Sequence, residues 1–338
     1  MSVAHAIRRL ADGQSLTREE ARAAVRDLVG GQSSEAQKGA LLLGLASRGE
    51  RAAELAGTVE ALRERMTPVP ARRRPLLDTC GTGGDGASTF NVSTAAAFVC
   101  AGAGLAVAKH GNRSVSSRCG SADVLEELGV PLEREASDAA EEIDRHGFAF
   151  LFAPAFHPAM REVAAARREL GVRTIFNLAG PLANPAGADR QLIGVGKFEI
   201  ARLLAEALAI LGTQRAVVFH SENGLDELTP GIPAIGFDVR GREATPWRFD
   251  PGVLAQRTVE RSEIAGGDAA QNAELLRRVL EGEPGPRRET VLLNAAAALW
   301  VAEAEPAFHE AYERARASID GGAARKALAR AAREEGSR

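Results

Sequence analysis

The chain has 338 residues, of which 45% are hydrophobic, so it can bury a substantial core. Its 42 Lys and Arg residues against 45 Asp and Glu residues leave a net charge of −3. That balance argues against a protein built mainly to bind nucleic acid or an acidic membrane surface, and we expect neither as a partner. Three cysteines without a Cys-x-x-Cys spacing indicate free thiols in a reducing compartment.

The sequence shows no segment typical of export or of membrane insertion. Residues 1–13 lack the apolar core of a signal peptide. The longest uncharged stretch, residues 86–108, is interrupted by serine, threonine, asparagine and glycine, whereas a spanning helix needs about 20 predominantly apolar residues. We therefore expect a cytoplasmic protein.

The first 70 residues predict a small helical domain. Thr17 and Ser34 each begin a capping box, in which a hydroxyl and the side chain three residues later satisfy free backbone N–H groups at a helix start. The Pro- and Arg-rich segment 68–75 then breaks the helical pattern, as a linker does. The predicted helical domain comprises residues 1–70 together with helices within 158–185. The second predicted domain comprises residues 75–338.

Beyond the linker, short apolar runs alternate with helical segments. The runs lie at 105–108, 148–152, 192–195 and 216–219, and residues 269–332 return to helices. Strands that alternate with helices are typical of βαβ units and of an α/β domain with a mostly parallel sheet. Functional side chains of such a sheet lie at the carboxyl ends of the strands.

The glycine-rich segment 78–94 follows the first predicted strand. Gly81, Gly83 and Gly86 match the Gly-x-Gly-x-x-Gly spacing of dinucleotide sites. Such a site also needs an acidic residue about 20 residues later, where this chain has Lys109 and His110. Glycines followed by Asn, Ser and Thr favour a phosphate held by backbone N–H groups and a helix start. A glycine turn used only for packing is the alternative interpretation.

A second polar segment, residues 109–121, follows the next predicted strand. Lys109 offers a point charge, Arg113 a bidentate fork and Ser114 a short hydroxyl donor. Seen alone, the segment is equally compatible with a polar surface loop. Two such segments at neighbouring strand ends favour a ligand that carries a diphosphate and a further phosphate.

The adjacent carboxylates Asp226 and Glu227 follow the run at 216–219. Magnesium takes oxygen ligands and commonly bridges protein carboxylates to substrate phosphates. Adjacent acids are common on surfaces, but beside a polyphosphate site they predict a magnesium site. Ser93 could supply a further oxygen ligand.

A helix expected from residue 159 would bring Met160, Val163 and Arg167 to similar faces. An arginine beside apolar groups could bind the carboxylate of a flat organic acid. His157 precedes a proline at this helix start, where packing or capping is the commoner role. For His110, the candidate nearest to the site for proton handling, we also favour a structural role.

Taken together, these motifs closely resemble the anthranilate phosphoribosyltransferase family, and the resemblance covers nearly the whole chain, from about residue 7 to 332. It rests on Gly81-Thr-Gly-Gly-Asp-Gly86, Asn91-Val-Ser-Thr94, Lys109-His-Gly-Asn-Arg-Ser-Val-Ser-Ser117, Gly120-Ser-Ala-Asp123, His157-Pro-Ala-Met160, Arg173-Thr-Ile-Phe-Asn-Leu178, Gly180-Pro-Leu182, Asn184-Pro185, Asp226-Glu227 and Leu292-Leu-Asn-Ala-Ala-Ala-Ala298.

The resemblance implies transfer of a phosphoribosyl group from phosphoribosyl pyrophosphate (PRPP) to the amine of anthranilate, with magnesium, in tryptophan biosynthesis. It also implies a nucleoside phosphorylase/phosphoribosyltransferase-like fold and a homodimer formed through the helical part. The PRPP contacts that it implies are Gly81, Gly83, Gly84, Asp85, Thr89, Asn91, Val92, Ser93, Thr94, Lys109, His110, Gly111, Asn112, Arg113, Ser114, Val115, Ser116, Ser117 and Ser121. The implied anthranilate contacts are Gly81, Asn112 and Arg167, and the implied magnesium ligands are Ser93, Asp226 and Glu227. It marks no residue as certainly catalytic.

Three alternative functions remain. A pyrimidine nucleoside phosphorylase would share the helical and α/β plan and bind phosphate in the glycine loop, but would leave the acidic pair little purpose. A non-catalytic nucleic-acid-binding relative is disfavoured by the net charge. A dinucleotide oxidoreductase is disfavoured by Lys109 and His110 at the end of the second strand.

Overall fold

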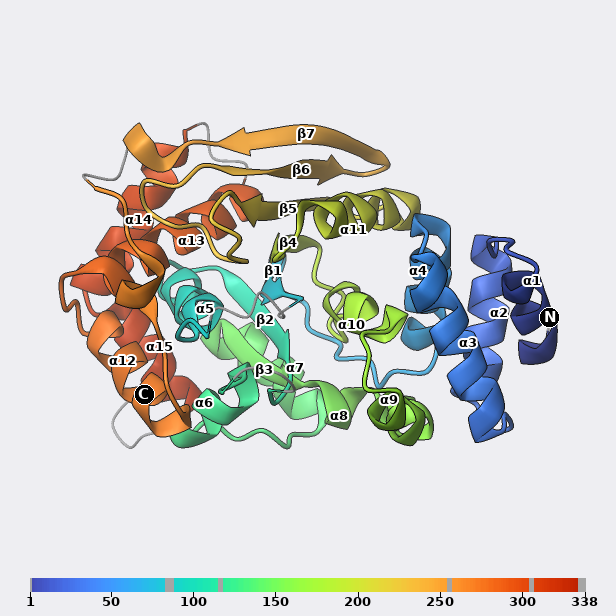
Figure 1. Ribbon diagram of the computed structural model, residues 1–338. Coiled ribbons are helices and arrows are strands. Elements are labelled where there is room, and N and C mark those ends of the chain that lie inside the picture. The colour runs from blue at the N-terminus through green and yellow to red at the C-terminus, as the bar shows by residue number, and fades with distance from the viewer. Residues whose placement is uncertain (1, 83–87, 115–117, 254–256, 304–306, 334–338) are drawn as a thin grey trace.

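The computed structural model describes residues 2–82, 88–114, 118–253, 257–303 and 307–333. This described part of the chain forms a helical part at one end and a seven-stranded sheet flanked by helices at the other (Figure 1). The helical part consists of α1 (Val3–Ala11), α2 (Arg18–Leu28), α3 (Glu35–Arg48) and α4 (Ala52–Arg63).

Two of these helices begin where the sequence predicts. The Thr17 hydroxyl accepts a hydrogen bond from the backbone N–H of Glu20, and the Glu20 carboxylate accepts one from the backbone N–H of Thr17. Ser34 and Gln37 form the same reciprocal pair at the start of α3. Both predicted capping boxes are therefore confirmed.

The strand order across the sheet is β3-β2-β1-β4-β5-β6-β7. The strands are β1 (Leu76–Gly81), β2 (Ala106–Gly111), β3 (Phe148–Phe152), β4 (Arg190–Gly194), β5 (Arg215–Ser221), β6 (Ala234–Arg240) and β7 (Glu243–Phe249). Strands β1 to β5 run parallel, and β6 and β7 are antiparallel to their neighbours. The predicted α/β fold with a mostly parallel sheet is confirmed, whereas the sequence patterns do not anticipate the β6–β7 hairpin.

The remaining helices connect and cover the strands. They are α5 (Val92–Gly102), α6 (Ser121–Glu127), α7 (Ala136–His146), α8 (Ala153–Phe156), α9 (Ala164–Leu170), α10 (Ile175–Ala179), α11 (Phe198–Leu211), α12 (Ala269–Leu280), α13 (Pro286–Glu303), α14 (Phe308–Asp320) and α15 (Ala323–Ala331). Short 3-10 helices span Pro158–Val163, Gly180–Leu182, Pro251–Val253 and Arg261–Ile264. Within the described ranges, no helix has both the length and the hydropathy that crossing a membrane requires.

Both faces of the parallel strands are buried. In β5, Val217 and Phe219 join a hydrophobic cluster with α5 and α13, whereas Ala216 and Val218 join a second cluster with α11 on the other face. The second cluster continues into the buried faces of α1 to α4. Burial on both faces explains why these strands read as continuous apolar runs in the sequence.

The helical part contacts the rest of the chain through several helices. Helix α3 contacts α9, and α4 contacts α10 and α11. Residues 66–75 form neither helix nor strand. The division into a domain of residues 1–70 with helices within 158–185, and a domain of residues 75–338, stays a prediction.

Candidate functional site

The chain order of the sheet reverses between β1 and β4, because β2 and β3 lie on one side of this pair and β5 lies on the other. In open α/β sheets, ligands bind at the carboxyl ends of the strands beside such a switch point. Here β1 and β4 end side by side, with Gly81 paired with Gly194. The predicted motifs follow β1, β2 and β5, so the fold brings all three to one edge of the sheet.

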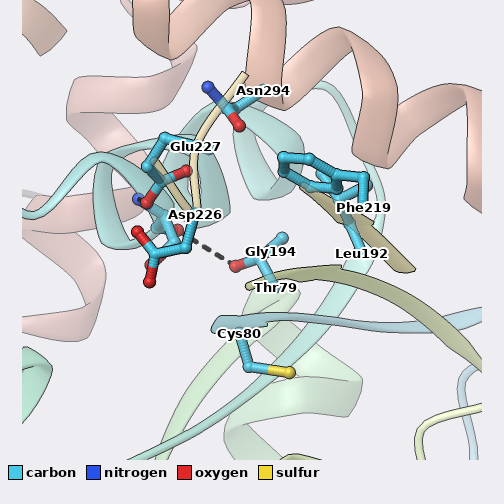
Figure 2. A pocket seen from close by; sticks show the side chains of 10 residues that line it. Thr79, Cys80, Leu192, Gly194, Phe219, Asp226, Glu227 and Asn294 are labelled. Atoms are coloured by element: carbon cyan, nitrogen blue, oxygen red, sulfur yellow. Dashed lines mark hydrogen bonds between the residues drawn. The ribbon is translucent and has the colours of Figure 1, made fainter. Parts of the chain in front are cut away.

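The acidic pair, Asp226 and Glu227, lies in the loop after β5, and both residues are half-buried. Glu227 Oε1 accepts a hydrogen bond of 3.2 Å from the backbone N–H of Ser93, in the first turn of α5. The partial positive charge at a helix start favours a carboxylate there. Asp226 lines the same small cavity as Ser93 and Glu227 (Figure 2). The fold thus brings together the three residues predicted as magnesium ligands.

This donor set suits magnesium. Two carboxylates and a serine hydroxyl are hard oxygen donors, which Mg²⁺ prefers. Mg²⁺ also keeps several waters and shares its shell with substrate phosphates, so its site must stay partly open to solvent. The half-buried state of Asp226 and Glu227 meets that need, and these two residues with Ser93 could hold the cation.

A cavity of about 10 Å³ lies beside the acidic pair. Its lining residues are Thr79, Cys80, Ser93, Ala96, Leu192, Gly194, Phe219, Asp226, Glu227 and Asn294. The volume is about that of one water molecule, far too small for a nucleotide-sized ligand. A ligand of that size at the acidic pair would have to lie outside this cavity.

Glycines at the ends of β1 and β4 allow the acidic loop to approach the sheet. A Cβ atom on Gly194 would lie 1.6 Å from the carbonyl oxygen of Asp226, and one on Gly81 would lie 3.0 Å from Asp226 Oδ2. Any side chain at position 194 would displace the loop backbone. Gly81 is among the site residues predicted from the sequence, whereas Gly194 is not; the one signal for Gly194 is a glycine within a strand pattern.

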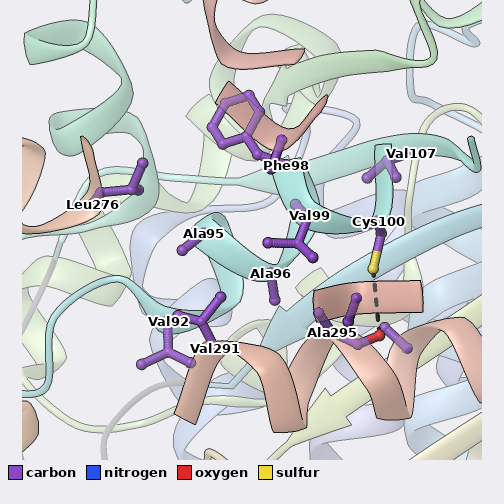
Figure 3. Packing of buried hydrophobic residues seen from close by; sticks show 14 of the residues in the cluster. Val92, Ala95, Ala96, Phe98, Val99, Cys100, Val107, Leu276, Val291 and Ala295 are labelled. Carbon is purple, nitrogen blue, oxygen red and sulfur yellow. Dashed lines mark hydrogen bonds between the residues drawn. The ribbon is translucent and has the colours of Figure 1, made fainter. Parts of the chain in front are cut away.

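Helix α5, which carries Ser93 at its start, packs closely against α13. Figure 3 shows Ala96 and Cys100 of α5 facing Val291 and Ala295 of α13. Cys100 Sγ donates a hydrogen bond of 3.6 Å to the carbonyl of Ala295. Because these side chains are small and buried, the core fixes the position of the helix start at the site.

Lys109 lies within β2, and only 2% of it is exposed. Its Nζ donates hydrogen bonds to the carbonyl of Thr79 at 2.6 Å and to the hydroxyl of Ser93 at 3.3 Å. Burial lowers the pKa of Lys109, and the nearby carboxyl of Asp78 opposes that shift. Lys109 therefore contacts a predicted metal ligand from the interior of the sheet.

A buried carboxyl group, Asp78, ties together β1, β2 and the segment before β4. It accepts hydrogen bonds from Asn184 Nδ2 at 2.8 Å and from the backbone N–H of His110 at 3.2 Å. Burial raises the pKa of Asp78 to about 6, although Lys109 acts in the opposite direction. Neither Asp78 nor Asn184 is among the site residues predicted from the sequence.

The segment after β2 is organised by Asp123 of α6. Its carboxylate accepts hydrogen bonds from the backbone N–H groups of Ser114 at 3.0 Å and Gly120 at 2.8 Å. Arg113 pairs with Asp123 at 3.0 Å and with Glu126 through two bonds of 2.8 and 2.9 Å. The guanidinium fork expected to bind phosphate is thus paired with carboxylates in this structure.

The start of α5 is linked to two other segments through Asn91. Its Oδ1 accepts a hydrogen bond of 2.9 Å from Asn272 Nδ2 in α12, and its Nδ2 donates one of 3.5 Å to the carbonyl of Cys119. Among the described residues, Thr94 Oγ1 is buried without a hydrogen-bond partner.

Several other predicted PRPP contacts can be placed. Thr89 forms an isolated bridge with Ala265, and Val92 lies in the core. Ser121 Oγ donates to the carbonyl of Asn112 at 3.3 Å. Gly111 ends β2, where a Cβ would lie 2.2 Å from Ser121 Oγ. Predicted contacts that lie outside the described residues are Gly83, Gly84, Asp85, Val115, Ser116 and Ser117.

A second cavity, of about 250 Å³, lies between α4 and the segments that follow β2 and β3. Its lining residues are Leu62, His110, Asn112, Ala153, Pro154, His157, Met160, Arg161, Ala164, Phe176, Gly180 and Ala183. Mostly apolar walls with a few polar groups are typical of small-molecule sites. Because Asn112 belongs to the segment after β2, this cavity adjoins the edge of the sheet that the sequence predicts to bind phosphate.

His110 and His157 share one wall of this cavity, with ring centroids 5.1 Å apart. His110 Nδ1 lies 3.2 Å from the carbonyl oxygen of Gly180, so this nitrogen carries the proton of the neutral ring. Burial lowers the pKa of His110 to about 3 and that of His157 to about 4. Within the described ranges, both Nε2 atoms are buried without a hydrogen-bond partner.

The single helix expected from residue 159 is two elements in the structure. Residues Pro158–Val163 form a 3-10 helix, and α9 begins at Ala164. With 3.0 residues per turn, the first element keeps Met160 and Val163 aligned, but Arg167 belongs to the second. Met160 lines the cavity, whereas Arg167 does not.

Arg167 lies directly behind the cavity wall. Its guanidinium stacks over the ring of Phe176, a lining residue, at 5.7 Å, and donates to Asn177 Oδ1 at 3.4 Å. Burial lowers the pKa of Arg167. No carboxylate of the described chain forms an ion pair with it, so this half-buried cation suits a carboxylate ligand.

The buried imidazole of His157 should make the protein less stable in acid. The pKa of His157 is about 4 in the folded chain against 6.5 for an ordinary histidine, so the unfolded chain takes up the proton first as the pH falls through this range. Between pH 7 and pH 4, we expect the free energy of unfolding of the parent protein to fall by about 3 kcal/mol more than that of a His157→Asn variant. Urea unfolding at successive pH values between 7 and 4 measures this difference.

The exposed His146 provides a matched control, since His146→Asn should keep the pH dependence of the parent protein. Asp78, whose pKa is raised, loses stabilisation as the pH rises towards 6, and this opposite effect is present in all three proteins. Parallel stability curves for the parent and His157→Asn would show that folding does not keep this imidazole neutral.

Two models of one protein family match most of the chain. The α/β domain of the glycosyl transferase family matches residues 73–325, and the helical bundle domain of the same family matches residues 4–66. Among named relatives, anthranilate phosphoribosyltransferase 2 of Streptomyces coelicolor is 52% identical over 91% of this chain and 92% of its own length. The anthranilate phosphoribosyltransferase of Thermomicrobium roseum is 47% identical over 96% of this chain and 94% of its own length.

Solved structures agree with these matches. The anthranilate phosphoribosyltransferase of Thermus thermophilus superimposes with a TM-score of 0.90 at 44% identity, covering 97% of this chain and 98% of the other. That of Saccharomyces cerevisiae, solved in complex with PRPP and Mg, superimposes with a TM-score of 0.88 at 26% identity, covering 96% and 95%. From its sequence and its fold alike, the chain belongs to the glycosyl transferase family and, within it, to the anthranilate phosphoribosyltransferases.

Proposed function

We propose that this protein transfers the phosphoribosyl group of PRPP to the amine of anthranilate, releasing pyrophosphate, as a step of tryptophan biosynthesis. The observation that carries this proposal is the acidic pair at the start of α5, with Glu227 bonded to the backbone of Ser93. A helix start that receives phosphates and a pair of carboxylates that holds magnesium are what a diphosphate leaving group needs.

We assign PRPP to the edge formed by the segments after β1 and β2. Departure of pyrophosphate leaves positive charge on the ribose ring and negative charge on the leaving group. When bound to Ser93, Asp226 and Glu227, Mg²⁺ would neutralise part of that negative charge. The N–H groups at the start of α5 and the buried Lys109 add fixed positive charge, which needs no reorganisation during the reaction.

We assign anthranilate to the cavity of about 250 Å³, which adjoins the PRPP edge at Asn112. The amine of anthranilate is a weak base that is neutral when it attacks, so no strong general base is required. The neutral rings of His110 and His157 offer Nε2 acceptors for its N–H groups. Arg167, reached past Phe176, would attract the carboxylate and hold the amine in line.

The helical part is the proposed dimer surface and, with helices within 158–185, the proposed smaller domain. Among the described residues, the most exposed large apolar side chains are Leu43 of α3 and Val172 after α9, which are 47% and 49% exposed. Both belong to this proposed smaller domain. Light scattering tests the proposal, since a homodimer has twice the 35.6 kDa mass of the chain.

A fluorescence assay tests the proposed reaction. Anthranilate should be consumed, and its fluorescence should fall, only when purified protein, PRPP and Mg²⁺ are all present. Phosphorolysis of thymidine would instead support a nucleoside phosphorylase, and a mobility shift of nucleic acid would support a binding protein. No consumption of anthranilate under these conditions would contradict the proposal.

Replacing Arg167 with alanine should raise the KM for anthranilate by about 10- to 100-fold, because a charged hydrogen bond to the substrate carboxylate is lost. The KM for PRPP and the kcat at saturating anthranilate should change little. The neighbouring Arg168 is exposed, so Arg168→Ala is a matched control expected to keep the parent kinetics. Equal anthranilate KM values in the two variants would remove Arg167 from the acceptor site.

A further inference from the structure

Asn294 places a polar amide in the middle of α13, a helix with an apolar buried face. The residue is 1% exposed, and residues 291–293 and 295–299 around it are buried and hydrophobic. An amide taken out of water destabilises the fold unless all its hydrogen bonds are satisfied. The partners of Asn294 therefore indicate why the amide is there.

The Asn294 amide forms a reciprocal pair with the backbone of Leu228, the residue after Glu227. Its Oδ1 accepts from the Leu228 N–H at 3.0 Å, and its Nδ2 donates to the Leu228 carbonyl at 2.8 Å. The second Nδ2 hydrogen is directed to the carbonyl of Thr290 at 2.8 Å. The Asn294 side chain thus holds the backbone of the acidic loop through both its oxygen and its nitrogen.

The carbonyl of Glu227 is held in a similar way. It accepts hydrogen bonds from Ser221 Oγ at 2.6 Å and from Thr229 Oγ1 at 3.3 Å, and both hydroxyl residues are fully buried. The Glu227 carboxylate points the other way, towards the N–H of Ser93. Figure 2 shows Asn294 beside Glu227, and both line the small cavity. Three buried side chains therefore fix the backbone of Glu227 and Leu228.

We propose that Asn294 is a positioning residue for the metal-binding pair, which it holds preformed from the C-terminal helix α13. This inference rests on the proposed function, because it takes Asp226 and Glu227 as the magnesium ligands. A preformed carboxylate loses little conformational freedom when the cation binds, and groups that orient metal ligands commonly change metal affinity by about 10- to 100-fold when removed. Ser221 acts in the same way through its hydrogen bond to the carbonyl of Glu227.

The test compares Asn294→Ala with Thr290→Val. Thr290 is fully buried one turn earlier in α13, and its hydroxyl donates only within the helix, to the carbonyl of Pro286 at 2.8 Å. Both substitutions remove a buried polar group from the same helix, but only the first releases the acidic loop. Ser221→Ala is a second, smaller change that acts on the loop without altering α13.

Two measurements are made on each protein: the Mg²⁺ concentration for half-maximal turnover at saturating PRPP and anthranilate, and the calorimetric affinity for Mg²⁺ in the presence of PRPP. For Asn294→Ala and Ser221→Ala, we expect the Mg²⁺ concentration for half-maximal turnover to rise at least about tenfold. Their kcat should be largely recovered at high Mg²⁺. Thr290→Val should stay within about twofold of the parent protein, although its melting temperature falls.

An unchanged Mg²⁺ requirement in Ser221→Ala and Asn294→Ala would overturn the proposal, as would an equal shift in Thr290→Val. If Asn294→Ala does not fold, the comparison of Ser221→Ala with Thr290→Val decides. The two proposals can fail separately. Parent protein that binds Mg²⁺ with PRPP but does not consume anthranilate contradicts the proposed reaction, and the calorimetric comparison still decides the role of Asn294.

Discussion

Changing both Asp226 and Glu227 to their amides should lower magnesium-dependent turnover by about 1,000-fold or more. The amides keep the shape of the side chains but remove two negative charges from the start of α5, where Glu227 bonds to the Ser93 backbone. Neutral amide oxygens are weaker ligands for Mg²⁺ than carboxylates. Turnover measured across a range of Mg²⁺ concentrations gives the result, and circular dichroism verifies that the variant is folded.

The control is Glu222→Gln. Glu222 precedes the pair in the same loop, is exposed, and pairs with Arg248 at 3.2 Å on the surface. Removing its charge should leave turnover and the Mg²⁺ requirement close to those of the parent protein. Normal turnover of the double amide variant at limiting Mg²⁺ would show that the cation is held elsewhere.

Replacing Gly194 with alanine should lower turnover by about 100-fold, although this position touches no substrate in the proposed function. The new Cβ would lie 1.6 Å from the Asp226 carbonyl oxygen and 2.6 Å from its carbonyl carbon, so the loop backbone must move. A displacement of about 1 Å at reacting or metal-binding groups can reduce rates to this extent. Overpacking should also lower the free energy of unfolding by about 2 kcal/mol. Steady-state kinetics and denaturant unfolding measure both effects.

The same chemical change at Gly39 serves as the control. A Cβ at Gly39 would meet nothing within 4 Å, and the position lies inside α3. Alanine there should keep turnover normal and raise helix stability by up to about 1 kcal/mol. If Gly194→Ala matched Gly39→Ala in rate, the close contact between β4 and the acidic loop would have no part in activity.

The parallel sheet was accessible from the sequence because its strands are buried on both faces. Runs such as 148–152 and 216–219 are apolar throughout and alternate with helical spacing, and they became β3 and β5. The β6–β7 hairpin has no such signal. Its strands carry glycine, aspartate and proline, and β7 is largely exposed. The pairing of β6 with β5 depends on Gly236, where a Cβ would lie 2.0 Å from the Val218 carbonyl oxygen.

The predicted site residues are those whose chemistry can be read from their type and spacing, such as Ser93, Asp226 and Glu227. Asn294 and Gly194 escape this reading because they act on backbone from distant elements: Asn294 holds a residue 66 positions away. Nothing local marks a buried asparagine as part of a metal site. Likewise, the sequence nominates His110 and His157 separately, but only the fold brings their ring centroids within 5.1 Å and leaves both Nε2 atoms buried without a hydrogen-bond partner among the described residues.

The contact between Ser93 and Glu227 joins residues 134 positions apart, across β1, β4 and β5. A growing chain that has not yet added β5 therefore contains the glycine-rich segment but lacks both carboxylates that the proposed function assigns to the divalent ion. Ligand added during refolding can favour only molecules in which these three strands have already docked. Substrate and cation thus select the finished sheet, and they cannot guide the earlier steps of its assembly.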